Sequence, residues 1–165
     1  AIVMDIFNDA WSHNWGFVPF TSAELEKLAN DMKMLVHGDY VAIVTYKGEN
    51  AAMSVTLPNL NDWIDGFDGR LLPFNWLKLA KAVIAKRPPS IRMPLLGVRK
   101  KFQDGILGSA LAVAAIDHVR NYHISRGTKG CEMSWILEDN MRIRHIIEEL
   151  GGVHYKTYRI YEKDL

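Results

Sequence analysis

Apolar residues recur along the chain with the periods of helices and strands, and their order predicts an α/β protein. Spacing of three and four residues, the period of one helix face, covers residues 1–11, 21–36, 59–67, 74–86, 107–126 and 140–150. Short apolar or β-branched runs, which favour strands, cover residues 40–46, 51–57, 91–98, 130–135 and 153–162. We therefore predict a mixed sheet with helices on both faces, in which 40–57 is an antiparallel hairpin and 91–135 a parallel crossover.

Capping signals mark where several of these helices begin and end. Thr21 and Glu24 have the spacing of a capping box, in which each side chain binds the backbone N–H of the other residue. Gly127 has the position of a C-cap after the longest helix. Asp139 or Asn140 is expected to cap the last helix at its N-terminus.

The stretch from Ser90 to Arg126 carries the strongest signal for a ligand. A cationic loop, residues 99–105, separates the strand 91–98 from the longest helical pattern in the chain. Apolar residues lie on more than one face of that pattern, so we expect the helix to pack on more than one side. The free backbone N–H groups and the dipole of a helix start suit a phosphate. The alternative is that the basic residues of the loop are an ordinary solvated charge run.

Composition narrows the class of protein. The 165 residues suit one domain, and a formal charge of +1 argues against a general nucleic-acid binder. Cys131 is the only cysteine, so no internal disulfide can form, and we expect a cytoplasmic setting. No apolar run is long enough to span a bilayer, and the histidines lack metal-ligand spacing, so we predict neither a membrane span nor a metal site. Because the chain begins without Met, we expect a fragment, a trimmed chain or a processed protein.

Two motifs make the chain resemble the GNAT acyl-CoA N-acyltransferases over roughly residues 1–162. In that family an acyl-CoA loop of the form Q/R-x-x-G-x-G/A is followed by a small residue and Leu. Gln103 and Gly108 fall on the first and last positions of that motif, with Ser109 and Leu111 after it. The run 132–140 resembles the family's next strand, which ends in an Asn that contacts pantetheine, here Asn140.

The resemblance implies a single GNAT-like domain over 1–165, or a C-terminal GNAT-like domain of a longer protein. It implies transfer of an acetyl or other acyl group from acyl-CoA to a small-molecule amine or a peptide, with no nucleic acid involved, and it leaves a homodimer open. Backbone N–H groups near the end of strand 91–98 would polarise the thioester carbonyl, and the loop amides would hold the pyrophosphate. The implied acyl-CoA contacts are Leu96, Gly97, Val98, Arg99, Lys100, Lys101, Gln103, Asp104, Gly105, Ile106, Leu107, Gly108, Ser109 and Asn140.

Catalysis also needs a base for the amine and an acid for the leaving thiolate. Glu132 is our candidate base, because desolvation in an apolar strand raises the pKa of a carboxyl group; the alternative is an ion-paired strand carboxylate. Ser134 would position a water, or would be a satisfied core hydroxyl. Tyr155 and Tyr158, with Tyr161, are the candidate acids, and cross-strand packing is the alternative for each.

Departures from the family pattern keep other functions open. Ile106 stands where the first loop Gly belongs, and Ile147 stands where a Tyr often serves as the acid. Either Ile106 is helical with its side chain turned into the core, or the pyrophosphate is held weakly, and Gly105 supplies the lost flexibility. A catalytically altered binding module and an acyl-carrier-protein-dependent long-chain acyltransferase are the alternative functions. The family's first strand is also missing.

An apolar insertion at about 58–89 replaces a connection that the family keeps short. It would cover an apolar cleft, dock a partner, lean on a membrane surface, or simply pack in the core. We expect it to shape the acceptor side with Trp63, Phe67, Phe74 and Trp76. We also predict that the strands ending near Val98 and Trp135 splay apart to admit pantetheine.

Overall fold

The computed structural model describes residues 2–12, 17–32, 35–159 and 161–163. The chain forms two compact units, Ala1–Trp135 and Ile136–Leu165. Residues 33 and 34 of the helix predicted over 21–36 lie outside the described residues, as do residues 15 and 16 of the stretch 15–20, which the sequence predicts to be an apolar loop.

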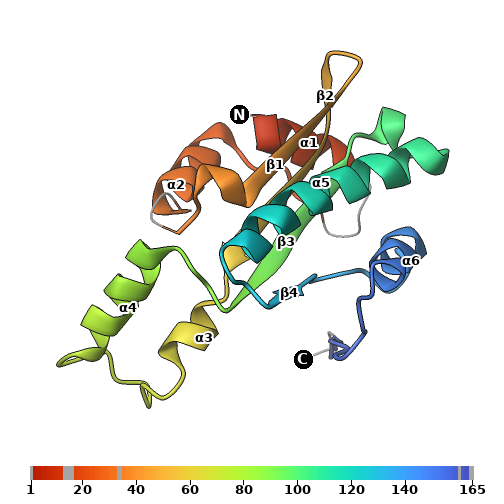
Figure 1. Ribbon diagram of the computed structural model, residues 1–165. Helices are drawn as coiled ribbons and strands as arrows, with labels where there is room; N and C mark the ends of the chain where they lie inside the picture. The colour runs from red at the N-terminus through yellow and green to blue at the C-terminus, as the bar shows by residue number, and fades with distance from the viewer. Residues whose placement is uncertain (1, 13–16, 33–34, 160, 164–165) are drawn as a thin grey trace. The chain divides into compact units, whose positions relative to one another are not determined.

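A four-stranded mixed sheet forms the first unit, in the order β1-β2-β3-β4 (Figure 1). The strands are β1 (Val41–Tyr46), β2 (Glu49–Pro58), β3 (Ser90–Val98) and β4 (Gly130–Glu132). The pairs β1–β2 and β2–β3 are antiparallel, and β3–β4 is parallel. The predicted hairpin, crossover and mixed sheet are thus confirmed.

The helices lie close to their predicted positions. They are α1 (Ile2–Trp11), α2 (Ser22–Met32), α3 (Leu60–Ile64), α4 (Asn75–Ala85), α5 (Gly105–Ser125) and, in the second unit, α6 (Met141–Glu149). Short 3₁₀ turns cover Gly38–Tyr40 and Lys100–Phe102. In the described part of the chain, no helix combines the length and the hydropathy that crossing a membrane requires.

Two helices cover opposite faces of the sheet. The Ser54 hydroxyl donates a hydrogen bond of 2.8 Å to the carbonyl oxygen of Ala115, so α5 lies on the face to which Ser54 points. Met53 is opposite Gly97, and a Cβ added at Gly97 would lie 2.4 Å from the Trp11 ring, so α1 lies on the other face. Since neighbouring residues of a strand point to opposite faces, one helix packs against each face of the sheet. The prediction of helices on both faces is confirmed.

Helix α5 buries a single stripe rather than the several faces that its apolar content predicted. The stripe consists of Gly108, Leu111, Ala112, Ala115, Ile116, Val119 and His123. Ala110, Ala114 and His118, which also recur at the three- and four-residue spacing of one helix face, are exposed. Alanine counts as apolar in a periodic pattern, but exposing its small side chain to water costs little free energy. The pattern therefore predicts a larger buried surface than the helix has.

Local capping signals are confirmed where they can be checked. The backbone N–H of Thr21 donates to Glu24 Oε2 at 2.9 Å, and the N–H of Glu24 donates to Thr21 Oγ1 at 3.3 Å. The backbone N–H of Thr21, and its hydroxyl at 2.8 Å, both donate to Glu24 Oε2 and lower the pKa of the Glu24 carboxyl group. Gly127, with a φ of +90°, follows the end of α5 as predicted.

One predicted strand is shorter than expected, and another is wrong. The strand predicted at 130–135 ends at Glu132, and residues 153–159 form no strand. A strand exists only as part of a ladder, whereas an alternating pattern records only the residues that would suit one. In the described residues the sheet has no ladder beyond β4, so the aromatic alternation of residues 153–159 does not become a strand.

Gly108→Ala is expected to destabilise the protein by about 2 kcal/mol, because it forces a methyl group into backbone atoms. A Cβ at Gly108 would lie 2.2 Å from the carbonyl oxygen of Gln103 and 2.8 Å from that of Phe102, and neither atom can swing aside. The better helix propensity of Ala offsets only about 1 kcal/mol. Urea unfolding of Gly108→Ala against Gly38→Ala, whose added Cβ meets nothing within 4 Å, measures the difference. Equal midpoints would contradict the expected clash.

Candidate acyl-transfer site

Strands β3 and β4 part at a fork. They pair only at Ser90–Gly130, Ile91–Cys131 and Arg92–Glu132, after which β4 ends while β3 continues to Val98. No described strand pairs with β3 on this side beyond Arg92. The predicted splay is therefore confirmed, and an edge of β3 is open along its C-terminal half.

Backbone donors line that open edge. The N–H of Arg99 donates to Ala51 on β2 at 2.8 Å, so alternate residues back along β3, Gly97 and Leu95, also face β2. The N–H groups of Leu96 and Val98 consequently point away from β2, toward the fork. The two donors lie two residues apart on an extended strand, about 6.8 Å. One of them can bind a carbonyl oxygen that gains negative charge, and the other is left for a second acceptor of the bound molecule.

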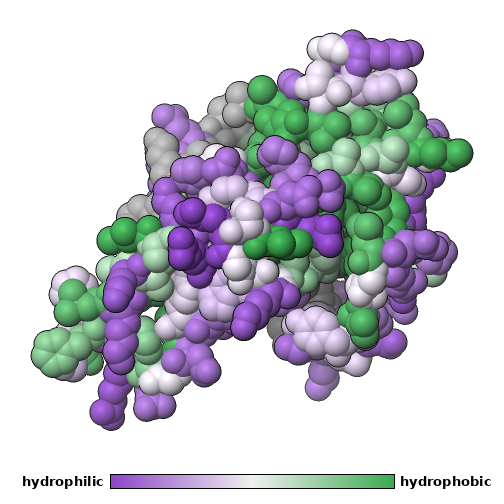
Figure 2. All heavy atoms as spheres, viewed as in Figure 1, coloured by the Kyte–Doolittle hydropathy of each residue, from purple (hydrophilic) through white to green (hydrophobic). Residues whose placement is uncertain are grey.

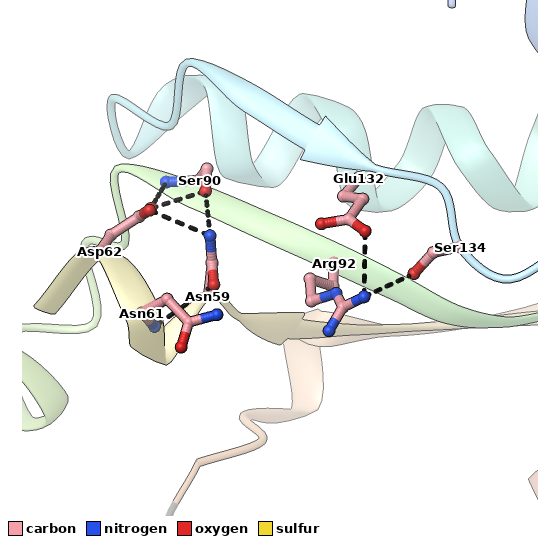
Figure 3. A network of polar contacts seen from close by, with 7 residues as sticks. All are labelled: Asn59, Asn61, Asp62, Ser90, Arg92, Glu132 and Ser134. Atoms are coloured by element: carbon pink, nitrogen blue, oxygen red, sulfur yellow. Dashed lines mark hydrogen bonds and ion pairs between the residues drawn. The ribbon is translucent and has the colours of Figure 1, made fainter. Parts of the chain in front are cut away.

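Three polar side chains meet at the apex of the fork (Figure 3). The Arg92 guanidinium donates to Glu132 Oε1 at 3.0 Å and to Ser134 Oγ at 3.2 Å. The side chains of Arg92 and Glu132 are 35% and 25% exposed, so the ion pair is partly shielded from water. Glu132 is therefore ion-paired in this structure, as the alternative interpretation stated. Ser134 accepts a hydrogen bond from the same Arg92 guanidinium.

Arg92 is the site residue that the sequence reasoning missed. It occupies a position inside an otherwise apolar run, 91–98, and a lone cation there needs a carboxylate partner. That requirement could have flagged Arg92. The identity of the partner depends on the β3–β4 register, which the sequence does not state.

The cationic loop closes against the end of β3. Gln103 Nε2 donates to the carbonyl oxygen of Val98 at 2.8 Å, which folds the loop back before α5 begins. Gly105 has a φ of +65° at the first position of α5, so it takes the left-handed conformation that Ile106 could not adopt easily. Ile106 is helical but 89% exposed, so the alternative in which its side chain turns into the core is wrong, and weak binding of the pyrophosphate stays a prediction.

The cations of the loop are engaged with acidic groups of the same chain. Arg99 forms an ion pair with Asp5 of α1, and Lys101 forms one with Glu49 of β2. The backbone N–H of Lys100 donates to Asp9 at 2.9 Å. Asp9, Glu49 and the three loop cations line a hollow of about 580 Å³ together with Gly48 and Asn50. An incoming phosphate would meet positive charge that is already partly neutralised.

The residues present fit a CoA pyrophosphate through backbone rather than side-chain groups. Helix α5 begins at Gly105 with no side-chain cap, which leaves its first N–H groups for an anion. The close approach of Gly108 to the Gln103 carbonyl keeps this turn compact. Leu107 and Ser109 belong to the same first turns of α5, so the predicted contacts from Leu96 to Ser109 form one continuous strand–loop–helix unit.

The remaining predicted site residues, Asn140, Tyr155 and Tyr158, lie in the second unit. Asn140 caps α6, and its Oδ1 accepts the N–H of Ile143 at 3.3 Å. Tyr155 and Tyr158 are 62% and 64% exposed, and neither lies in a strand. The predicted cap at Asn140 is confirmed, whereas the catalytic assignment of the two tyrosines stays a prediction.

Asn140→Ala is expected to affect folding as well as any ligand contact, contrary to a purely functional role. Loss of an N-cap costs about 1 kcal/mol, because a helix N–H loses its acceptor. Thermal unfolding should show this loss in the absence of CoA, and Asn140→Asp, which keeps an acceptor oxygen, should recover it. Full stability of Asn140→Ala would mean that the cap contributes nothing.

Comparison of sequences finds relatives longer than this chain. No family model matches the sequence. The chain is 45% identical over 161 residues to the protein named bacterial ceramide synthase of Caulobacter vibrioides, covering 98% of this chain and 42% of that protein. It is 38% identical over 164 residues to protein YghO of Escherichia coli, covering 99% of this chain and 42% of that protein. The chain therefore spans less than half the length of these curated relatives.

Solved structures with a similar fold are acetyltransferases. The aminoglycoside 6′-N-acetyltransferase AAC(6′)-IG of Acinetobacter haemolyticus matches with a TM-score of 0.57 at 11% identity, covering 99% of this chain and 91% of that chain. AAC(6′)-Iy, solved with the bisubstrate analogue CoA-S-monomethyl-acetylneamine, matches with a TM-score of 0.55 at 12% identity, covering 98% and 92%. Together with the forked mixed sheet and the crossover helix α5, this likeness shows that the chain has the fold of the GNAT acetyltransferases.

Proposed function

We propose that this chain carries the acyl-transfer site of an N-acyltransferase that moves a fatty acyl group from acyl-CoA to the primary amine of a long-chain base. The fork is the observation that carries the proposal, because it leaves the N–H groups of Leu96 and Val98 directed at the open edge of β3. The 45% identity to a protein named bacterial ceramide synthase supports the choice of acceptor, since a ceramide is the amide of a fatty acid and a long-chain base.

Each residue of the site has a defined task in this reaction. The amine nitrogen attacks the thioester carbon, and the N–H of Leu96 or of Val98 donates to the oxyanion that forms. Glu132 accepts the proton from the amine, directly or through a water held by Ser134, while Arg92 orients the carboxylate. The C–S bond then breaks, and the phenol of Tyr155 or Tyr158 protonates the CoA thiolate. The loop amides from Gln103 to Ser109 hold the pyrophosphate, and Asn140 contributes a pantetheine contact.

An assay of acyl transfer with defined acceptors tests the proposal. The purified protein is incubated with palmitoyl-CoA and sphinganine, and in parallel with a short alkylamine and an aminoglycoside, while amide product and free CoA thiol are quantified. Formation of N-palmitoyl sphinganine with an equal amount of thiol is expected. Product only from hydrophilic amines would reject the long-chain acceptor. CoA binding without any product would favour a binding module, and a requirement for acyl carrier protein would reject acyl-CoA as the donor.

A further inference from the structure

The apolar insertion projects from the sheet as an arm, defined here as residues 59–89, which contains α3 and α4 (Figure 1). Core packing does not explain it, because no residue of α4 is buried. Of the four aromatic rings expected to shape a site, only Phe67 is buried, while Phe74 and Trp76 are 69% and 46% exposed. Other large apolar side chains exposed on the arm are Leu60, Ile64, Leu71, Leu72, Leu77 and Ile84.

Helix α4 is amphipathic, with an apolar face next to a basic one. At 100° per residue, Trp76, Ala80 and Ile84 follow one another at four-residue spacing, and Leu77 lies beside them. Lys78 and Lys81, three residues apart, share the adjoining face. Figure 2 shows apolar green atoms interleaved with polar purple chains over the arm. Such an amphipathic helix is suited to an interface between an apolar and an aqueous environment.

In the half of the arm that follows Gly69 and contains α4, every charged side chain is positive. Between Gly69 and Gln103 the sequence contains no Asp or Glu. The arm itself contributes Arg70, Lys78, Lys81, Lys86 and Arg87 over that range. In a chain whose formal charge is only +1, this is a concentrated cationic surface. Its complement is an anionic partner.

The apolar side chains are held outward by internal hydrogen bonds. Trp76 Nε1 donates to the carbonyl oxygen of Pro73 at 3.0 Å, and its backbone N–H donates to that of Leu71 at 2.9 Å. Asn75 Nδ2 donates to the carbonyl oxygen of Arg70 at 2.7 Å. The connection before α4 is therefore fastened to the helix, so Leu72 and Phe74 are presented as part of a formed surface.

The base of the arm is fastened beside the fork (Figure 3). Asp62 of α3 accepts the backbone N–H of Ser90 at 2.9 Å and its hydroxyl at 2.6 Å, and Asn59 also donates to Asp62. Ser90 begins β3 two residues before Arg92. Whatever binds the arm is consequently held near the apex of the proposed acyl-transfer site.

We propose that the arm docks on the surface of an anionic phospholipid bilayer. Trp76, Phe74 and Ile84 enter the interfacial region, while Lys78, Lys81 and their neighbouring cations bind the lipid phosphates. The apolar face of α4 adjoins Lys78 and Lys81, while the acidic residues of the arm, Asp62, Asp65 and Asp68, all precede Gly69. That half of the arm matches an anionic lipid surface, and an acidic protein would require far fewer exposed apolar side chains. This inference goes beyond the proposed function and does not need it, although a membrane-resident amine would then reach the fork directly.

Vesicle flotation of the purified protein tests the docking without any turnover. Phosphatidylcholine vesicles with roughly a third of phosphatidylglycerol should retain the protein, whereas pure phosphatidylcholine should retain about tenfold less. The pair Lys78→Gln and Lys81→Gln is expected to lower partition into anionic vesicles about tenfold. The pair Phe74→Ser and Ile84→Ser should lower it at least as much, because each removes a large apolar side chain from the interface.

Matched variants separate docking from general charge and hydropathy. Lys27→Gln with Arg120→Gln removes two exposed cations elsewhere, and Val18→Ser with Ile124→Ser removes two exposed apolar side chains elsewhere. Both pairs should bind vesicles like the parent.

Failure of the parent to float, equal binding to both lipid mixtures, or equal losses in these controls would each overturn the proposal. So would self-association that disappears in the arm variants without vesicle binding, because a second copy would then cover the arm. Acyl transfer from micellar substrate can succeed or fail independently of all these results.

Discussion

Glu132→Gln is expected to lower the rate of acyl transfer by about 10²–10⁴-fold while leaving CoA affinity unchanged. The carboxylate lies at the apex of the fork, bound through Oε1 to Arg92, beside the strand edge that carries the proposed carbonyl donors. A Gln amide keeps an acceptor oxygen for Arg92, so the local structure survives. It cannot accept a proton from the amine, so the step that needs a base loses its acceptor.

The pH dependence separates a base from a positioning group. A base must be unprotonated, so the parent rate falls on the acid side, and Glu132→Gln should lose that acid limb. Glu138→Gln makes the same charge change at an exposed site and should behave like the parent. Calorimetry with CoA provides the binding measurement. An unchanged pH–rate profile in Glu132→Gln would remove Glu132 as the base and leave it as a partner of Arg92.

Features that depend on a few neighbouring residues could be predicted from the sequence. The Thr21–Glu24 capping box, the Asn140 cap and the left-handed Gly105 are all set by local backbone chemistry. The order of elements between Val41 and Glu132 also follows from apolar periodicity. The fork followed from the family resemblance rather than from any local pattern.

Features that depend on pairing between distant segments could not be predicted. The partnership of Arg92 with Glu132 exists only because β3 and β4 pair in one register. Residues 153–159 have the alternation of a strand but no ladder in the described sheet. The sequence likewise marked the 58–89 insertion as apolar, and only the structure shows that α4 buries none of its residues.

A second large effect is expected in acid, where the free energy of unfolding should fall by about 3 kcal/mol between pH 6.5 and pH 4 because of His123. The residue is 2% exposed, and burial lowers the pKa of its imidazole from 6.5 to about 4. In the unfolded chain the imidazole binds a proton below pH 6.5, whereas in the folded chain it stays neutral down to about pH 4. Stability is thus fully present above pH 6.5 and is lost as the pH falls toward 4.

The surroundings of the two His123 ring nitrogens explain why the imidazole stays neutral in the folded state. Thr56 Oγ1 donates to the carbonyl oxygen of Tyr40 at 2.9 Å, so its lone pair accepts the N–H at Nε2 of His123, also at 2.9 Å. His123 Nδ1 is buried and has no hydrogen-bond partner among the residues that the structure describes, so protonation would create both an unpaired donor and a buried charge.

Urea unfolding at several pH values measures this effect. His123→Gln keeps an N–H donor for Thr56 but does not titrate, so its stability should vary less between pH 6.5 and pH 4 than that of the parent. His118→Gln, on the exposed side of the same helix, should retain the parent slope. If His123→Gln loses stability in acid as steeply as the parent, another buried group is responsible and the neutral His123 is not the acid-sensitive element of this fold.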